Sequence, residues 1–311
     1  MHAIRIHQFG DTDNLKLEEV PQPQPQPGEV LIRTEACGVN PIDWKTCSGG
    51  GAAPFIGDLP FIPGWEFAGV VDVANDVAGL QPGDPVYGMI RFPDPAGCYA
   101  EYLVAPAEQI CKRPAGLDAI TAGGLATAGL TAWQALFDKG GMNAGQRVLI
   151  LGAAGGVGHL AVQLAALHGA EVYGTASSKN HAFVAALGAK QLFDYQDTDI
   201  TSVAKDMDLI IDAVGGETAI QALPCLKPGG RMVTLPSVTK DAVMAAGDLR
   251  GVQVLPIRCE PSAKQLAEIA QLYADKKLCL NIADSLPLAD VAEAFKRSAE
   301  GHVRGKLVLT L

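Results

Sequence analysis

The sequence has few of the features that disulfide-rich, metal-binding or membrane proteins need. Its seven cysteines include no Cys-x-x-Cys pair, and their number is odd. This pattern argues against a disulfide framework and favours reduced thiols. The six histidines do not cluster at the spacing of metal ligands. No run of about 18 uncharged apolar residues occurs, so we expect neither a transmembrane helix nor a membrane partner.

An excess of positive charge is also missing. The formal net charge is −10, whereas a large nucleic-acid interface needs a positive face to meet the phosphates. We therefore expect no nucleic-acid partner. Residues 1–10 have neither the long apolar stretch nor the cleavage pattern of a signal peptide, and they are typical of a first strand. These features together predict a cytoplasmic protein.

The length of 311 residues suits two domains. Up to about residue 120, short apolar runs alternate with turns such as Pro27-Gly28, which is typical of an antiparallel β domain. Four prolines alternate with glutamines over residues 21–27. Because proline favours extended backbone, we interpret this stretch as a stiff surface connector.

The pattern changes after residue 120, where a helix is expected over residues 122–137. Strands then alternate with helices, which predicts an α/β domain: a doubly wound parallel sheet with helices on both faces. The strands are expected at residues 147–151, 171–175, 191–193, 209–213, 231–235 and 252–256. Helices are expected at residues 157–167, 180–187, 261–276 and 288–298, before a last strand at 306–311.

A glycine-rich turn follows the first of these strands. Gly152, Gly155 and Gly156 precede Val157, at which we expect a helix to begin. Glycines let the strand turn sharply, let backbone approach a diphosphate and let the helix pack tightly on the strand. The diphosphate would bind N–H groups at the helix start. We predict a dinucleotide site rather than a purely structural turn. No Lys-Ser/Thr pair follows, which argues against a P-loop, and His159 is expected to face solvent.

The residues after the second strand of this domain indicate which dinucleotide binds. NAD enzymes place a carboxylate there, about 20 residues beyond the glycines, to hold the ribose 2′-hydroxyl. This sequence instead has Ser177, Ser178 and Lys179. Two hydroxyls and a lysine on an acid-free rim suit a 2′-phosphate, which Tyr195 could help to enclose. We predict NADPH as the cofactor, with a solvated surface lysine as the alternative role for Lys179.

The carboxyl ends of two further strands should border the rest of the cofactor. Ligands of open α/β sheets bind at this end of the strands. Gly215 follows the fourth strand and Leu235 ends the fifth. We therefore expect the backbone near these two residues to lie beside the ribose and the nicotinamide.

These motifs, taken together, resemble the medium-chain dehydrogenase/reductase superfamily and, within it, the zinc-free quinone oxidoreductase branch. The resemblance covers nearly the whole chain and rests on the glycine turn and on residues 27–31, 38–43, 63–69, 83–84, 100–102, 228–230 and 305–309. It implies a GroES-like domain over residues 1–120, completed by residues 261–311. It also implies a Rossmann NADPH-binding domain over residues 121–260, with nicotinamide and substrate in a cleft between the domains.

The chain departs from the zinc alcohol dehydrogenases of this superfamily at the metal site. Asn40 and Thr127 stand where those enzymes have cysteine ligands, and Trp65 stands at the position of the histidine ligand. Ile42 replaces the hydroxyl residue that relays the alcohol proton. Catalytic zinc needs three protein ligands, so we expect no metal. Cys37, three residues before the first ligand position, is expected to pack in the interior.

Without a Lewis acid, the resemblance implies an acceptor that is already conjugated, namely a quinone or an α,β-unsaturated carbonyl. Asn40 and Thr127 would line the nicotinamide side of the site, and Trp44 and Trp65 would form an apolar wall. The alternatives are a turn-forming Asn40, a helix-start Thr127 and core tryptophans. Glu66 is assigned either a buried hydrogen-bonding role or a catalytic one. The proton is expected to come from solvent or from a cofactor hydroxyl.

Two other functions remain open at this point. One is a low-turnover NADPH-binding protein like the crystallin-type relatives of the family, and the other is a zinc-type alcohol dehydrogenase. The predicted strand at residues 251–257 should lie at a sheet edge, where an apolar strand offers a pairing surface. Family members often dimerise there, so the resemblance implies a homodimer.

Overall fold

A computed structural model describes residues 1–75, 77 and 79–311, which form two compact units. The first unit contains Met1–Leu130, Glu260–Lys276 and Leu280–Leu311, and the second contains Thr131–Cys259 and Lys277–Cys279. The expected α/β class with a β domain and a Rossmann-type domain is confirmed. Among the described residues, no helix combines the length and apolar character needed to cross a bilayer.

The sheet of the first unit has the strand order β14-β15-β3-β4-β5-β7, with β6 also pairing with β3. Its pairs are antiparallel except for β14 and β15. The strands are β3 (Glu29–Val39), β4 (Glu66–Val73), β5 (Pro85–Met89), β6 (Tyr102–Pro106), β7 (Ile110–Lys112), β14 (Ile282–Pro287) and β15 (Lys306–Thr310). A separate two-stranded sheet pairs β1 (His2–Ile6) with β2 (Leu15–Glu19).

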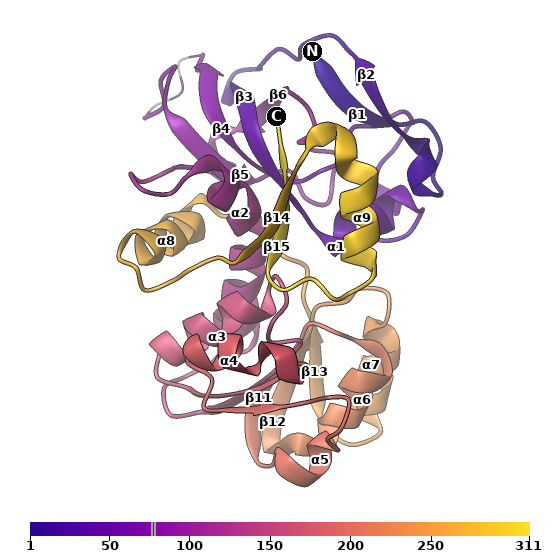
Figure 1. The fold of residues 1–311 in the computed structure, drawn as a ribbon, viewed down its shortest axis with the longest axis vertical. Helices are drawn as coiled ribbons and strands as arrows, with labels where there is room; N and C mark the ends of the chain where they lie inside the picture. The colour runs from indigo at the N-terminus through magenta and orange to yellow at the C-terminus, as the bar shows by residue number, and fades with distance from the viewer. Residues whose placement is uncertain (76, 78) are drawn as a thin grey trace. The chain divides into compact units, whose positions relative to one another are not determined.

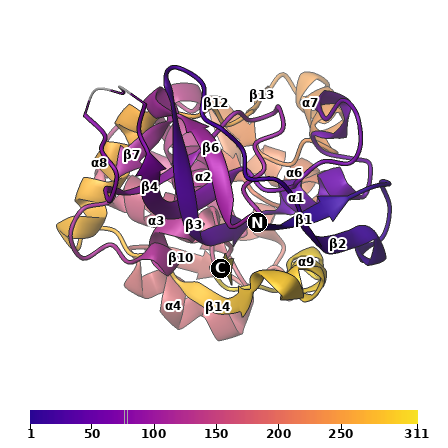
Figure 2. The same cartoon turned by 90° about the horizontal axis from the view of Figure 1, so that it is seen from above.

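The last strand returns to the β domain, as the resemblance implied. Leu309 of β15 pairs with Cys37 of β3, and residues 307–309 are almost fully buried. The helix α9 (Val291–Ala299) lies beside β15 and α1 (Pro41–Cys47) (Figures 1 and 2). The Tyr87 hydroxyl donates a 2.6 Å hydrogen bond to the Leu266 carbonyl of α8 (Ala263–Ala274), which fixes that helix to the sheet.

The boundary between the units lies ten residues later than the predicted one, because α2 (Ala119–Trp133) packs mainly on the first unit. Its glycines allow a close approach. A Cβ at Gly123 would come within 2.8 Å of the Ala36 Cβ on β3, and one at Gly124 would meet the Val308 side chain of β15 at 3.0 Å. The chain continues from α2 into a π-helical segment, Gln134–Lys139.

The second unit has the predicted parallel sheet, with the order β10-β9-β8-β11-β12-β13. The strands β8 (Arg147–Leu151), β9 (Glu171–Thr175) and β10 (Gln191–Phe193) have the predicted bounds. They are joined by β11 (Met207–Asp212), β12 (Leu226–Thr234) and, at the predicted edge, β13 (Gln253–Pro256). The helices are α3 (Gly158–Leu167), α4 (His181–Ala186), α5 (Ile200–Val203), α6 (Gly216–Ala222) and α7 (Lys240–Asp248).

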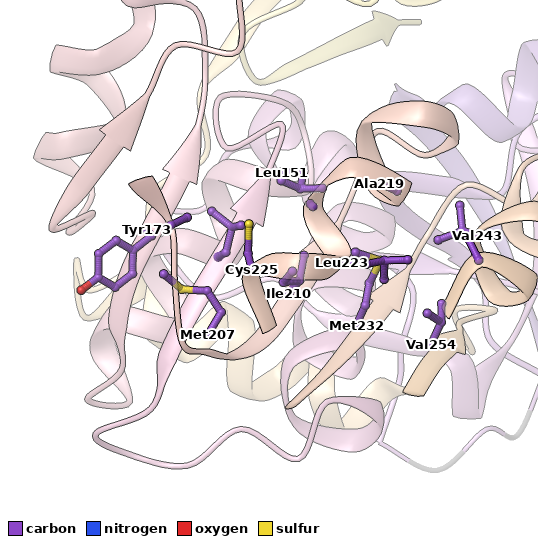
Figure 3. Close-up of a cluster of buried hydrophobic side chains, with 14 of the residues drawn as sticks. Leu151, Tyr173, Met207, Ile210, Ala219, Leu223, Cys225, Met232, Val243 and Val254 are labelled. Atoms are coloured by element: carbon purple, nitrogen blue, oxygen red, sulfur yellow. The ribbon is translucent and has the colours of Figure 1, made fainter. Parts of the chain in front are cut away.

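A hydrophobic cluster holds α6 and α7 against this sheet (Figure 3). Ile210 and Met232 contribute from the neighbouring strands β11 and β12, and Leu223 and Val243 contribute from the helical side. Each of these four side chains is fully buried. Burying such a side chain stabilises a fold by about 1.5–3 kcal/mol, so the cluster gives the carboxyl ends of the strands a firm base.

Candidate functional site

A buried lysine organises polar groups from three strands of the first unit. The Lys306 Nζ donates to the Asn40 Oδ1 at 2.6 Å, to the Val39 carbonyl at 2.9 Å and to the Glu66 Oε1 at 2.9 Å. The ammonium group therefore has an acceptor for each of its three hydrogens. The side chains of Lys306 and Glu66 are only 4% and 0% exposed. We call Asn40, Glu66 and Lys306 the buried polar cluster.

The Glu66 carboxylate links this cluster to α2. Its Oε1 accepts a 2.7 Å hydrogen bond from the Asn40 Nδ2, and its Oε2 accepts one of 2.7 Å from the Thr127 backbone N–H. A Cβ at Gly38 would overlap the carboxylate, which explains why glycine stands there. The amide of Asn40 is held in one orientation, because its oxygen faces an ammonium group and its nitrogen faces a carboxylate.

A second buried carboxylate lies at the start of α1. The Asp43 Oδ2 accepts hydrogen bonds from the Asn40 backbone N–H at 2.7 Å and from the Tyr99 hydroxyl at 2.9 Å. Its Oδ1 is buried and accepts no hydrogen bond from any residue that the structure describes. Burial disfavours the charged form and raises the pKa of Asp43 to about 7, although the two donors oppose the shift. The sequence analysis missed Asp43 and Tyr99, which lie far apart in the chain.

The two tryptophans proposed as a substrate wall occupy different environments. Trp65 is 2% exposed, its indole N–H donates to the Asp94 carbonyl at 2.8 Å, and Phe92 packs edge-on against it at 5.5 Å between centroids. These contacts favour the core-packing alternative for Trp65. Trp44 is half-buried, and its indole N–H donates to the Ser298 Oγ of α9 at 3.2 Å.

The expected interior position of Cys37 is confirmed. The residue is fully buried, and its Sγ donates to the Cys98 carbonyl at 2.9 Å. Burial raises the pKa of its thiol well above the ordinary value. Over the described part of the chain, no group of three or more His, Cys, Asp or Glu side chains is arranged to hold a metal ion.

In the second unit, the glycine turn connects β8 to α3 and requires residues without side chains. Gly152 has φ +72°, and a Cβ at Gly158 would collide with the Gly152 carbonyl. The turn is held against β9, because Thr175 accepts hydrogen bonds from the N–H groups of Gly152, at Oγ1, and of Ala153, at its carbonyl. The backbone at this position can therefore come close to a diphosphate, which is the fit that a dinucleotide needs.

The helix α3 begins at Gly158, one residue later than predicted. Gly156 and Val157 precede this helix and Gly158 is its first residue, so their N–H groups have no acceptor in an earlier helical turn and are the candidates to bind the diphosphate. The prediction for His159 was wrong. This residue is fully buried, and its Nδ1 lies 2.8 Å from the Gly155 carbonyl, so it braces the turn instead of facing solvent.

The backbone around Gly215 and Leu235 is held by one buried residue, Asp212, at the carboxyl end of β11. The Asp212 Oδ1 accepts from the N–H of Gly215 at 2.7 Å, and the Asp212 carbonyl accepts from the N–H of Leu235 at 2.9 Å. The Thr234 hydroxyl donates to the Asp212 Oδ2 at 2.7 Å. Gly215 has φ +83°, which favours glycine. The predicted pair of loops is thus brought together by Asp212.

The residues predicted to hold a 2′-phosphate come from two neighbouring strands. Ser177, Ser178 and Lys179 follow β9, Tyr195 follows β10, and Tyr195 is 51% exposed. Together with Asp194 they form what we call the ribose rim. The Asp194 Oδ2 accepts from the Ser178 backbone N–H at 2.7 Å. The expectation of an acid-free rim was therefore wrong, because the acid comes from the end of the third strand and reaches the loop after the second.

Comparisons with known proteins agree with this fold. Residues 26–115 match the family model described as an alcohol dehydrogenase GroES-like domain, and residues 187–309 match a zinc-binding dehydrogenase model. The chain is 31% identical to a chloroplast envelope quinone oxidoreductase homolog of Arabidopsis thaliana, over 99% of this chain and 98% of that protein.

Two solved structures bear on the site. A quinone oxidoreductase from Coxiella burnetii has a TM-score of 0.95 and 38% identity, covering 100% of this chain and 99% of that chain. A mycobacterial protein solved in complex with NADPH has a TM-score of 0.85 and 27% identity, with 100% of both chains covered. The resemblance stated from the sequence is confirmed at the level of the family.

We predict that Lys306→Met will lower the free energy of unfolding by about 3–5 kcal/mol, because it leaves the Glu66 carboxylate buried without its counter-ion. The double variant Lys306→Met/Glu66→Gln should recover much of this loss. Urea unfolding followed by tryptophan fluorescence measures both. Lys112→Met is the matched control, because Lys112 pairs with Asp84 at the surface and should contribute under about 1 kcal/mol. A loss no larger than the control's would refute the argument.

The raised pKa of Asp43 predicts a pH dependence of stability. In the unfolded chain this carboxyl has the ordinary pKa of 3.8, whereas in the folded protein the pKa is about 7. The folded state therefore binds the proton more tightly, and the resulting stabilisation is complete below the unfolded pKa and is lost as pH rises through the folded one.

In the wild type, the stabilisation from Asp43 should be lost between about pH 4 and pH 7, which lowers the free energy of unfolding. We expect Asp43→Asn to make this fall smaller by roughly 1–4 kcal/mol. Urea unfolding across this range tests the expectation. Asp72→Asn, at an exposed position of the same unit, should leave the dependence unchanged. Parallel pH curves for wild type and Asp43→Asn would show that Asp43 does not titrate in this range.

Proposed function

Because the chain belongs to the quinone oxidoreductase branch of the medium-chain dehydrogenase/reductase superfamily, we propose that it reduces a quinone or an α,β-unsaturated carbonyl with NADPH and without catalytic zinc. The observation that carries this proposal is the glycine turn, which lies beside a rim bearing Ser177, Ser178 and Lys179. The names of the relatives from Arabidopsis and Coxiella support a quinone as the acceptor.

The described residues fit a phosphorylated dinucleotide. The turn offers backbone N–H groups of Gly156, Val157 and Gly158 to the diphosphate, and Lys179 offers the rim a cation for the 2′-phosphate. The NADPH complex of the mycobacterial relative supports this choice of cofactor. When bound, NADPH supplies a hydride, that is, one proton with two electrons, and is thereby oxidised to NADP⁺.

The protein's own contribution is to position the acceptor and to stabilise the charge that forms on its oxygen. Asn40 is 6% exposed and uses one Nδ2 hydrogen to bond Glu66. Its second Nδ2 hydrogen bonds no residue within the described ranges and can donate to an acceptor oxygen as negative charge develops there. Thr127 is held near Asn40, because its backbone N–H bonds the other oxygen of the same Glu66 carboxylate. A proton from solvent completes the product, either a hydroquinone or a saturated carbonyl compound.

The proposal that zinc is not needed rests on the buried polar cluster. Asn40, Trp65 and Thr127 are poor ligands for zinc. Lys306 places a positive charge 2.6 Å from the Asn40 Oδ1 and 2.9 Å from the Glu66 Oε1. A second cation at this position would be repelled, and Glu66 already has a counter-ion.

The proposal also includes two properties that lie outside the site, namely a homodimer and a cytoplasmic location. The apolar strand β13 (Gln253–Pro256) lies at the edge of the parallel sheet, so a second copy could pair there to form a homodimer. Sedimentation at micromolar protein concentration distinguishes this dimer from a monomer.

All seven cysteines belong to the described residues and are free thiols, which favours a reducing compartment such as the cytoplasm.

Steady-state oxidation of NADPH with a panel of quinones and enones tests the function, and metal analysis of the same preparation tests the role of zinc. We expect turnover with at least one acceptor and no stoichiometric zinc. Binding of NADPH without reduction of any acceptor would favour the low-turnover alternative. Stoichiometric zinc that is required for activity would favour the alcohol dehydrogenase alternative.

We predict that Lys179→Ala will weaken NADPH binding about tenfold and leave NADH binding nearly unchanged, because only NADPH carries the 2′-phosphate. Dissociation constants from titration calorimetry measure both effects. Lys205→Ala, at another exposed lysine of the second unit, is the matched control. Equal weakening of NADPH and NADH by Lys179→Ala would show that this lysine does not contact the 2′-phosphate.

A further inference from the structure

We propose that Asp194 is a specificity-determining residue whose carboxylate weakens the preference of the ribose rim for NADPH over NADH. This inference rests on the proposed function, because it concerns the same cofactor site. It assigns a role to a residue that stands outside the local pattern of hydroxyls and lysine after β9.

Strand pairing places Asp194 beside the loop that follows β9. Phe193, the last residue of β10, pairs with Thr175, the last residue of β9. The Ala176 N–H then donates to the Phe193 carbonyl at 3.1 Å, so the two chains leave the sheet together. As a result, Asp194 lies level with the start of the Ser177–Lys179 loop, although 16 residues separate it from Ser178.

The carboxylate of Asp194 uses both oxygens to hold backbone. Its Oδ2 accepts from the Ser178 N–H at 2.7 Å, and its Oδ1 accepts from the Gln196 N–H at 3.0 Å. The N–H donors, that of Gln196 foremost, lower the pKa of Asp194, so the group is an anion at neutral pH. An anion of the protein thus already occupies the N–H of Ser178, which leaves this donor unavailable to a phosphate group.

This arrangement affects the two cofactors differently. The 2′-phosphate of NADPH is itself an anion, and it would meet one cation, Lys179, and one anion, Asp194, on the same rim. Repulsion by Asp194 offsets part of the attraction by Lys179. NADH has a 2′-hydroxyl at this place, which is not repelled and can donate a hydrogen bond to a carboxylate. The rim should therefore accept NADH more readily than a rim with Lys179 alone.

Removing the charge of Asp194 at nearly constant volume tests the inference, and an asparagine there can still accept one of the two backbone hydrogen bonds. We expect Asp194→Asn to lower the dissociation constant of NADPH roughly two- to fivefold at low salt, the size typical of an exposed charge interaction. The dissociation constant of NADH should stay the same or rise. Titration calorimetry with each cofactor gives the ratio of the two constants without any acceptor. The change should shrink at high ionic strength, because salt screens exposed charges.

Two further variants separate charge from structure. Asp197→Asn removes the same charge from an exposed position three residues further on, and it should leave the ratio of dissociation constants nearly unchanged. Asp194→Ala removes the charge together with both hydrogen bonds. It should also shift the ratio towards NADPH, even if looser backbone weakens the binding of both cofactors.

The outcomes distinguish this inference from the proposed function. In both Asp194 variants, the ratio of the two dissociation constants could stay constant or move towards NADH. That result would show that Asp194 only braces the loop, and it would overturn the inference. NADPH binding by the wild type would still uphold the proposed function. If wild type bound neither cofactor, the proposed function itself would fail, and the inference would fall with it.

Discussion

The ion pair between Lys306 and Glu66 is the interaction on which the first unit depends. Lys306 begins the last strand of the chain, Glu66 begins β4, and Asn40 follows β3. Burying a charge is costly unless a partner satisfies it, so β15 cannot leave the sheet without leaving Glu66 unpaired. The same pair fixes the amide of Asn40 and bonds the backbone of Thr127, which lies in the middle of α2. The Lys306 ammonium group therefore both holds β15 in the sheet and orients the polar side chains of Asn40 and Glu66.

The second unit uses backbone more than side chains to build its site. The glycine turn depends on the absence of side chains, since a Cβ at Gly158 would collide with the carbonyl of Gly152. Side chains matter at the carboxyl ends of the strands, where Asp212 fixes the loops at Gly215 and Leu235. The hydrophobic cluster of the second unit stabilises the strands that carry these loops. In the proposed site, diphosphate binding and cofactor selectivity would thus belong to separate, neighbouring loops.

Elements with a strong local pattern were predictable from the sequence. The bounds of β8, β9 and β10 agree with the prediction, because each strand is a short run that begins two or three residues after a glycine. The helix α2 was less predictable, because its assignment to the first unit depends on which neighbours its glycines meet. His159 was misplaced for a related reason: a polar residue at a helix start looks exposed until the packing of its face is known.

Local sequence patterns were enough to predict the two-domain α/β organisation and the glycine turn after β8, and the family resemblance aligned Asn40, Trp65 and Thr127 with zinc-ligand positions. The folded structure was needed to show that Lys306 bonds Asn40 across 266 positions of the chain and that the Asp194 carboxylate accepts a hydrogen bond from the Ser178 N–H. Periodicity and glycine placement act through the backbone dihedrals of neighbouring residues, so they can be read locally. Contacts between strands depend on which strands pair and in which register, and no single segment contains that information.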